Sequence, residues 1–181
     1  MEIIKTPIDG LYVIEPKVFT DERGAFFESF NLKLFQATIY SKAQFVQDNI
    51  STSKKNVIRG LHFQAPPFAQ GKLVSVVQGK VLDVAVDLRK KSSTYGKHFS
   101  VELSFENKKM LWIPEGFAHG FAALENDTIF SYKCTNYYNK ESEGSLIYND
   151  PILNINWGIN QEIISEKDKL AQPFSTFVSP F

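Results

Sequence analysis

The chain has 181 residues and a formal net charge of zero, with 20 Lys and Arg against 20 Asp and Glu. A chain of this length buries about 70% of its unfolded surface, so it needs neither a disulfide nor a metal to hold its core. The balanced charge argues against a nucleic-acid binder or a polybasic membrane-surface protein, and one cysteine excludes an intrachain disulfide and a cysteine-built zinc site.

No run of about 18 consecutive apolar residues is present, so the sequence predicts no membrane-spanning helix. The first residues contain an early acid, Glu2, and an early proline, Pro7, in place of an apolar segment, so we expect no secretory signal. We therefore expect a cytoplasmic protein. No repeat or linker interrupts the chain, which predicts a single domain over residues 1–181.

The predicted elements are mostly short strands. In chain order, a short helix is expected over residues 31–39, then a series of strands, then a short helix opened by Ser165-x-x-Asp168. The expected strands cover residues 45–53, 57–63, 73–77, 81–88, 99–103, 111–113, 121–124 and 128–135. Many short strands separated by Gly, Pro and Asn indicate an all-β sandwich or barrel rather than a parallel α/β sheet.

Two of these strands have informative alternation. The strand over residues 45–53 places polar side chains on one face, namely Gln47, Asn49, Ser51 and Ser53. Such a face lines a ligand cavity or meets solvent, and the sequence leaves both interpretations open. In the strand over residues 81–88, Asp83, Ala85 and Asp87 alternate with Val84, Val86 and Leu88, which predicts one buried face.

Four segments, residues 19–30, 59–74, 113–121 and 132–143, combine charged, aromatic and small side chains. A sugar-nucleotide interpretation would use these residue types as follows. Removing a proton next to a ketone uses a base such as His, and a buried Lys stabilises the enolate oxygen. A Tyr can return the proton on the opposite face, while Arg binds a diphosphate through paired hydrogen bonds. An aromatic ring with an amide or carboxylate binds a nucleotide base.

Each candidate also has a purely structural interpretation. His62 could be a core or surface residue, and Tyr132 could be a core residue with a bonded hydroxyl. Asp168 could serve only as the third residue of a capped helix. Lys72 and Arg59 could be solvated. His119, expected in a glycine-rich turn, is a better candidate, because small neighbours let a ligand approach the backbone.

The histidines are a poor match to a metal-binding jelly roll. His62 is followed by Phe63 and Gln64, and Lys72 stands where an acidic ligand would be needed. An ammonium group repels a divalent ion and supplies no lone pair. We therefore expect no catalytic metal and no cofactor.

Together, the segments resemble the dTDP-4-dehydrorhamnose 3,5-epimerase family. The resemblance extends from Gly10-Leu11 to the Ser165–Asp168 stretch. It is carried by Arg59-Gly60-Leu61-His62-Phe63-Gln64, Gln70-Gly71-Lys72-Leu73-Val74, Val84-Ala85-Val86-Asp87-Leu88-Arg89, Pro114-Glu115-Gly116-Phe117-Ala118-His119-Gly120-Phe121 and Asn149-Asp150-Pro151. It implies a cupin-like jelly-roll β-barrel or sandwich with a few short peripheral helices, and a homodimer. The implied activity is metal- and cofactor-independent conversion of dTDP-4-dehydro-6-deoxy-D-glucose to dTDP-4-dehydro-L-rhamnose.

The resemblance also implies roles for individual residues. His62 resembles the general base, oriented by Asp168, with Lys72 as the enolate stabiliser and Tyr132 as the opposing acid. Arg59 and His119 resemble substrate- and phosphate-contacting residues. Nucleotide-binding positions, some reaching across the dimer, are implied for Arg23, Phe26, Glu28, Gln47, Asp48 and Asn49. Further binding positions match Tyr138, Glu143 and Lys167, although Asn139 departs from the proline that is commoner there.

One local conflict yields a structural prediction. Regular strand alternation would place Arg59 and His62 on opposite faces, so we expect a kink or bulge near Gly60. Three alternative functions also stay open: a monoepimerase acting only at C3, a metal-dependent cupin oxygenase or isomerase, and a non-catalytic module that binds a sugar nucleotide.

Overall fold

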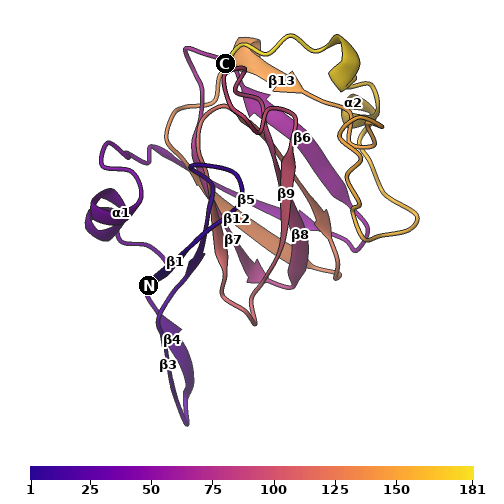
Figure 1. The fold of residues 1–181 in the computed structure, drawn as a ribbon. Coiled ribbons are helices and arrows are strands. Elements are labelled where there is room, and N and C mark those ends of the chain that lie inside the picture. The colour runs from indigo at the N-terminus through magenta and orange to yellow at the C-terminus, as the bar shows by residue number, and fades with distance from the viewer.

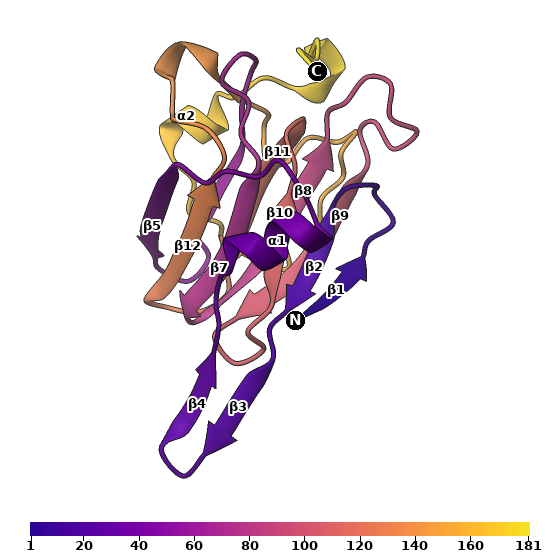
Figure 2. The same ribbon diagram turned by 90° about the vertical axis from the view of Figure 1, so that its left-hand side faces the viewer.

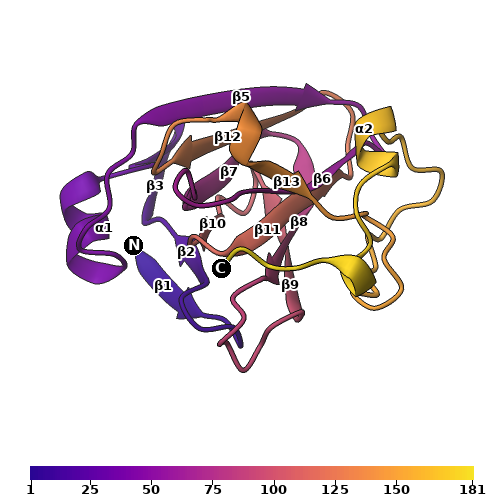
Figure 3. The ribbon, with the colours of Figure 1, turned by 90° about the horizontal axis from the view of Figure 1, so that it is seen from above.

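Two antiparallel sheets lie face to face in a computed structural model that describes residues 1–181 (Figures 1 and 3). One sheet has six strands in the order β1-β2-β10-β7-β12-β5, and the other has five in the order β13-β6-β11-β8-β9. Apart from β1–β2 and β8–β9, neighbouring strands in each sheet come from distant parts of the chain, which confirms the predicted cupin-like jelly roll.

Most predicted strands are present with ends shifted by a few residues. They are β5 (Gln47–Ser53), β6 (Ile58–Gln64), β7 (Lys72–Gln78), β8 (Lys80–Asp87), β9 (His98–Ser104), β10 (Met110–Ile113), β11 (Phe117–Ala123) and β12 (Thr128–Cys134). The sequence patterns did not predict the remaining strands, which are β1 (Glu2–Lys5), β2 (Tyr12–Glu15), β3 (Val18–Asp21), β4 (Gly24–Phe27) and β13 (Glu143–Ser145).

Strand β8 is buried on both faces, so the prediction of a single buried face was wrong. Asp83 and Asp87 are both 0% exposed. Buried carboxylates are tolerated when they are paired and hydrogen-bonded. Asp83 accepts from His119, and Asp87 accepts hydrogen bonds from Arg89 and from two hydroxyls of the following loop. The alternation of polar and apolar residues in β8 therefore reflects two buried faces of different polarity rather than one buried and one exposed face.

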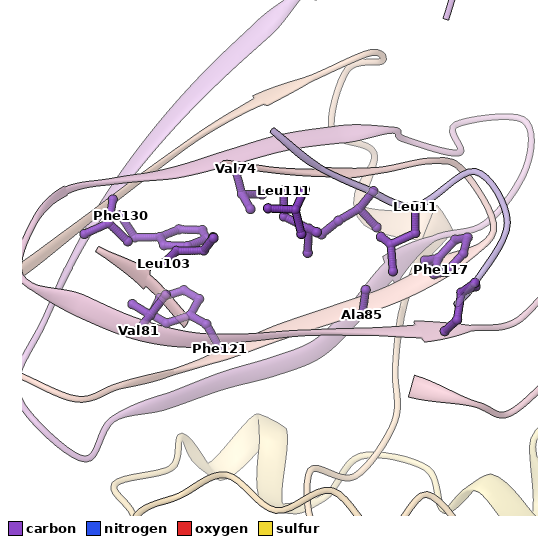
Figure 4. Packing of buried hydrophobic residues seen from close by; sticks show 13 residues of the cluster. Leu11, Val74, Val81, Ala85, Leu103, Leu111, Phe117, Phe121 and Phe130 are labelled. Carbon is purple, nitrogen blue, oxygen red and sulfur yellow. The ribbon is translucent and has the colours of Figure 1, made fainter. Parts of the chain in front are cut away.

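The main core fills the space between the sheets (Figure 4). At one end the rings of Phe121 and Phe130 stack with their centroids 4.2 Å apart, close to Val81 and Leu103. Toward the other end Leu11, Phe117 and Ala85 pack together. Burying these side chains supplies the hydrophobic stabilisation that joins the two sheets.

Separate apolar clusters cover the outer faces of the sheets. Helix α1 (Leu32–Thr38) begins after Asn31, whose side chain accepts a hydrogen bond from Leu34, and packs Phe35 against Trp112 of the six-stranded sheet. The C-terminal segment covers the five-stranded sheet through Leu146, Leu153 and Trp157. It contains α2 (Glu166–Lys169) and the 3₁₀ turn Phe174–Thr176, and another 3₁₀ turn, Lys140–Ser142, precedes β13. Both predicted helices are therefore present.

Strands β3 and β4 form a hairpin that projects from the sandwich (Figure 2). Its residues are exposed along nearly all of its length. None of the helices has both the length and the apolar character needed to cross a membrane.

Candidate active site

A cavity of about 500 Å³ opens between the two sheets beside α2. Its lining combines titratable side chains with an apolar wall that includes Phe121 and Phe130. The titratable and cationic side chains in the lining come from both sheets and from α2, and they are Arg59, His62, Lys72, His119, Tyr132, Lys167 and Asp168. The fold thus brings together in one cavity residues that are widely separated in the sequence.

The irregularity expected near Gly60 is present in β6. His62 lies opposite His119, but Arg59 lies opposite Phe121, so β6 has one more residue than β11 over this interval. Gly60 has a φ of +124°, and a Cβ there would lie 2.6 Å from the Gly120 Cα. Only glycine fits this close approach. The bulge turns both Arg59 and His62 toward the cavity.

His62 and Asp168 form a short hydrogen-bonded pair. Nε2 of His62 lies 2.6 Å from Oδ1 of Asp168, and the two side chains are 33% and 6% exposed. Asp168 is also the third residue of a capped helix, as the sequence allowed, because its backbone N–H donates to the Oγ of the cap residue Ser165. Its carboxylate accepts a further hydrogen bond from the backbone N–H of Gly60. Burial opposes ionisation of Asp168, but its hydrogen bonds, above all the one with His62, hold its pKa below the usual value.

Lys72 begins β7 and extends into the cavity, where it forms no ion pair. Its ammonium group lies 6.0 Å from the ring centroid of Tyr132. Burial lowers the pKa of Lys72, and the charges of Asp83 and Glu143 partly oppose that shift. An ammonium group in such surroundings acts strongly on any negative charge that develops nearby.

Tyr132 reaches the cavity from β12, and its hydroxyl makes no hydrogen bond within the protein, unlike the bonded core tyrosine that the sequence also allowed. Burial raises the pKa of its phenol, so the phenol keeps its proton at neutral pH. Asn49 of β5 is its cross-strand partner. The polar face of β5 therefore turns inward, as one of the two predicted interpretations required.

Arg59 and His119 are both held by groups beside the cavity. Arg59 donates from Nε to the Ser53 Oγ at 3.1 Å and from a terminal nitrogen to the Thr52 carbonyl at 2.9 Å. His119 holds its Nε2 3.0 Å and 3.1 Å from the two carboxylate oxygens of Asp83. His119 lies within β11 rather than in a turn, so its predicted setting was wrong. The glycines around it serve the close packing of β11 on β6.

A chain of hydrogen bonds joins the remaining predicted binding residues near the cavity. The Gln47 amide donates to Asn49, and the backbone N–H of Tyr138 donates to Gln47. The Tyr138 hydroxyl donates to Glu143 at 3.1 Å, and Lys167 donates to the same carboxylate at 2.6 Å. Burial of Glu143 opposes its ionisation, but the bonds from Lys167 and Tyr138 keep its pKa below the usual value. These residues thus form one connected polar surface that reaches the cavity at Lys167.

The comparisons with known proteins identify the family. The model of the dTDP-4-dehydrorhamnose 3,5-epimerase family matches residues 5–176. The chain belongs to this family. It is 55% identical over 172 residues to the dTDP-4-dehydrorhamnose 3,5-epimerase of Salmonella typhimurium, with 94% of each chain covered. The enzyme is therefore an isomerase of the dTDP-4-dehydrorhamnose 3,5-epimerase type.

Solved structures of epimerases agree with this assignment. The dTDP-6-deoxy-D-glucose-3,5-epimerase of Legionella pneumophila, solved in complex with dTDP-4-keto-L-rhamnose, superposes with a TM-score of 0.94. It is 49% identical, and the match covers 98% of this chain and 94% of that one. A double mutant of a 3'-monoepimerase from Streptomyces bikiniensis superposes with a TM-score of 0.89 at 28% identity, covering 96% of this chain and 87% of that one.

Four predicted binding residues of the epimerase lie away from the cavity. Arg23, Phe26 and Glu28 belong to the projecting hairpin and its exit, and Phe26 is 71% exposed. Asp48 faces outward from β5, where it forms an ion pair with Lys133 at 2.9 Å. The fold of one chain does not bring these four residues to the epimerase cavity.

Asp83 and Ser53 are the supporting residues that the sequence reasoning missed as site residues. Each holds a cavity side chain, His119 and Arg59 respectively. The signal for Asp83 was present, since an aspartate within an apolar strand requires a buried partner. No group of three or more His, Cys, Asp and Glu side chains is arranged to hold a metal ion.

Proposed function

We propose that the chain inverts C3 and C5 of dTDP-4-dehydro-6-deoxy-D-glucose to give dTDP-4-dehydro-L-rhamnose for dTDP-L-rhamnose synthesis. The observation that carries this proposal is the His62–Asp168 pair placed in one cavity with Lys72 and Tyr132. The names of the relatives, several of them 3,5-epimerases at 48–55% identity, support the choice of reaction and substrate. The reaction would proceed without a metal or cofactor.

In the first half of each inversion, His62 removes the proton from the carbon next to the C4 ketone. The C–H electron pair forms the enolate, whose negative charge collects on O4. Lys72 stabilises that oxygen, and a preorganised donor of this kind is worth about 10²–10³ in rate. Asp168 holds the ring of His62 in place and stabilises the imidazolium that forms.

In the second half, Tyr132 donates its phenolic proton to the opposite face of the same carbon. The enolate collapses to the ketone, which leaves His62 protonated and Tyr132 ionised, and exchange with solvent restores both groups. Burial raises the pKa of Tyr132, which supports its role as the acid because the phenol is protonated before the step. The same groups would act at C3 and at C5.

We propose that the substrate is bound by Arg59 and His119 at its diphosphate and by Gln47, Asn49, Tyr138, Glu143 and Lys167 around the nucleotide. We further propose a homodimer in which the partner subunit supplies its hairpin to the site. The distance of Arg23, Phe26 and Glu28 from their own cavity supports this arrangement, as does the projection of that hairpin from the sandwich. Asp48 would face the same subunit boundary.

Incubation with the substrate in heavy water tests the reaction. Deuterium entering both C3 and C5 is expected, with dTDP-4-dehydro-L-rhamnose as the product. Deuterium at C3 alone would instead identify a monoepimerase, the activity named for the Streptomyces bikiniensis neighbour. No exchange at either carbon would refute the proposed reaction. His62→Ala separates catalysis from binding, because a binding module would lose affinity alone whereas an enzyme loses turnover.

Subunit complementation tests the shared site. His62→Ala and Arg23→Ala proteins, each inactive alone, are expected to regain activity when they are mixed and allowed to exchange subunits. A mixed dimer then contains one cavity with an intact His62 and an intact Arg23 from the partner. A monomer in sedimentation experiments, or no regain after confirmed exchange, would refute the shared site.

A further inference from the structure

Ser51 in β5 has the only buried side-chain nitrogen or oxygen that lacks a hydrogen-bond partner, its Oγ. Its neighbours on the same face of the strand are all bonded. Gln47 donates to Asn49, Asn49 donates to the sulfur of Cys134, and Ser53 accepts from Arg59. An unpartnered buried hydroxyl costs folding free energy, so it calls for a functional explanation.

Ser51 is one of the residues that line the catalytic cavity. Its cross-strand partner in β12 is Phe130, an apolar residue that offers no hydrogen bond, and Ile50 beside it is also apolar. The polar neighbours on the same face, Asn49 and Ser53, bond elsewhere, so no protein group pairs with the Ser51 hydroxyl.

The position of Ser51 indicates which part of a substrate it meets. Two residues before it, Asn49 pairs with Tyr132, and two residues after it, Ser53 anchors Arg59. Consecutive strand residues rise about 3.3 Å, so the stretch from residue 49 to 53 spans about 13 Å, comparable to a hexose with its phosphate. Ser51 lies at the middle of that span, between the proposed acid and the proposed diphosphate-binding arginine.

We propose that Ser51 is a substrate-binding residue whose hydroxyl donates a hydrogen bond at the anomeric end of the sugar. The acceptor is the 2-hydroxyl or the phosphate oxygen bonded to C1, because these oxygens lie between the reacting carbons and the diphosphate. This inference rests on the proposed function, in which Tyr132 faces the reacting carbons and Arg59 binds the diphosphate. It adds a contact at a position to which the family resemblance assigned no role.

The Ser51→Ala variant tests the inference through two measurements, KM for the sugar nucleotide and Tm. Losing one hydrogen bond to the substrate raises KM for the sugar nucleotide about threefold to tenfold. The same change removes the unpartnered hydroxyl, so Tm is expected to stay equal or to rise. A purely structural serine would instead lower Tm when replaced. Ser131→Ala is the matched control, since Ser131 lies in the neighbouring strand between the inward-facing Phe130 and Tyr132 and therefore points outward.

Calorimetric binding of dTDP alone assigns the acceptor. Weaker dTDP binding by Ser51→Ala places the contact on the phosphate, and unchanged dTDP binding together with a raised KM places it on the sugar. A KM within twofold of wild type, or a raised KM accompanied by a lower Tm, would overturn the inference. Wild-type protein is assayed in parallel, so that failure of the epimerase reaction itself is seen in the wild type and failure of this inference only in the variant.

Discussion

Replacing Asp168 with Asn tests the His62–Asp168 pair with little change in shape. The amide oxygen can still accept from His62 across the 2.6 Å contact, but the negative charge is lost. A hydrogen bond to a charged group contributes about 1.5–3 kcal/mol, and about 1.4 kcal/mol changes a rate tenfold. We therefore expect Asp168→Asn to slow proton removal about 10-fold to 150-fold. Binding of the sugar nucleotide is expected to change little, because Asp168 contacts His62 rather than the substrate.

The assay is the initial rate of deuterium entry at C3 in heavy water, with substrate binding measured by calorimetry. Glu166→Gln on the same helix is the control, since Glu166 is exposed and pairs only with Lys169. An exchange rate for Asp168→Asn within threefold of wild type would refute the role of the pair. An equal loss in affinity and in rate would do so as well, because it would indicate a collapsed site.

The same variant changes how stability depends on pH. The pKa of Asp168 is lowered by folding, so its ionised form stabilises the protein above the unfolded pKa, and that contribution disappears as pH falls through the folded pKa. Asp168→Asn is therefore expected to lower Tm at neutral pH and to differ less from wild type in acid. Thermal unfolding between neutral pH and pH 3 measures this, and a constant difference in Tm would contradict the sign.

Three further predictions concern the other site residues. Tyr132→Phe is expected to impair product formation more than proton exchange, and equal losses in both would show that Tyr132 is not the second acid. Lys72→Met is expected to slow exchange about 10²–10³-fold. Because burial lowers the pKa of Lys72, the loss of wild-type activity as pH rises should begin below the ordinary lysine value of 10.5. The same alkaline loss in Lys72→Arg would show that it does not arise from Lys72. Gly60→Ala places a Cβ 2.6 Å from the Gly120 Cα, and overpacking of this kind costs about 1–3 kcal/mol, so a Tm equal to wild type would refute the steric argument.

Strand alternation and turn residues were enough to predict the layered β architecture, because most strands have an apolar face that must be buried. The hairpin of β3 and β4 was invisible to the same reasoning, since Val18 and Phe26 are exposed together with their polar neighbours. In such a segment there is no buried face that requires every second residue to be apolar. Its conformation depends on pairing within the hairpin and, in our proposal, on a partner subunit.

The candidate site was predictable where motif residues and strand geometry agreed. Arg59 and His62 share the cavity because of the bulge that their spacing required. The setting of His119 was misjudged because its small neighbours suggested a turn, whereas they permit two strands to approach closely. The aspartate within the apolar strand β8 indicated that Asp83 needs a buried partner, but the identity of that partner, His119, depends on a contact between strands that no local pattern contains.

The placement of Asp168 has a consequence for biosynthesis. The pair it forms with His62 joins positions 106 residues apart, and α2 lies in the last part of the chain. A nascent chain that already contains every strand of the sandwich still lacks this carboxylate. In our proposal, turnover therefore begins only after the C-terminal segment has emerged from the ribosome and docked. A premature stop after β13 would remove the orienting carboxylate of Asp168 together with Leu153 and Trp157, which cover the outer face of the five-stranded sheet.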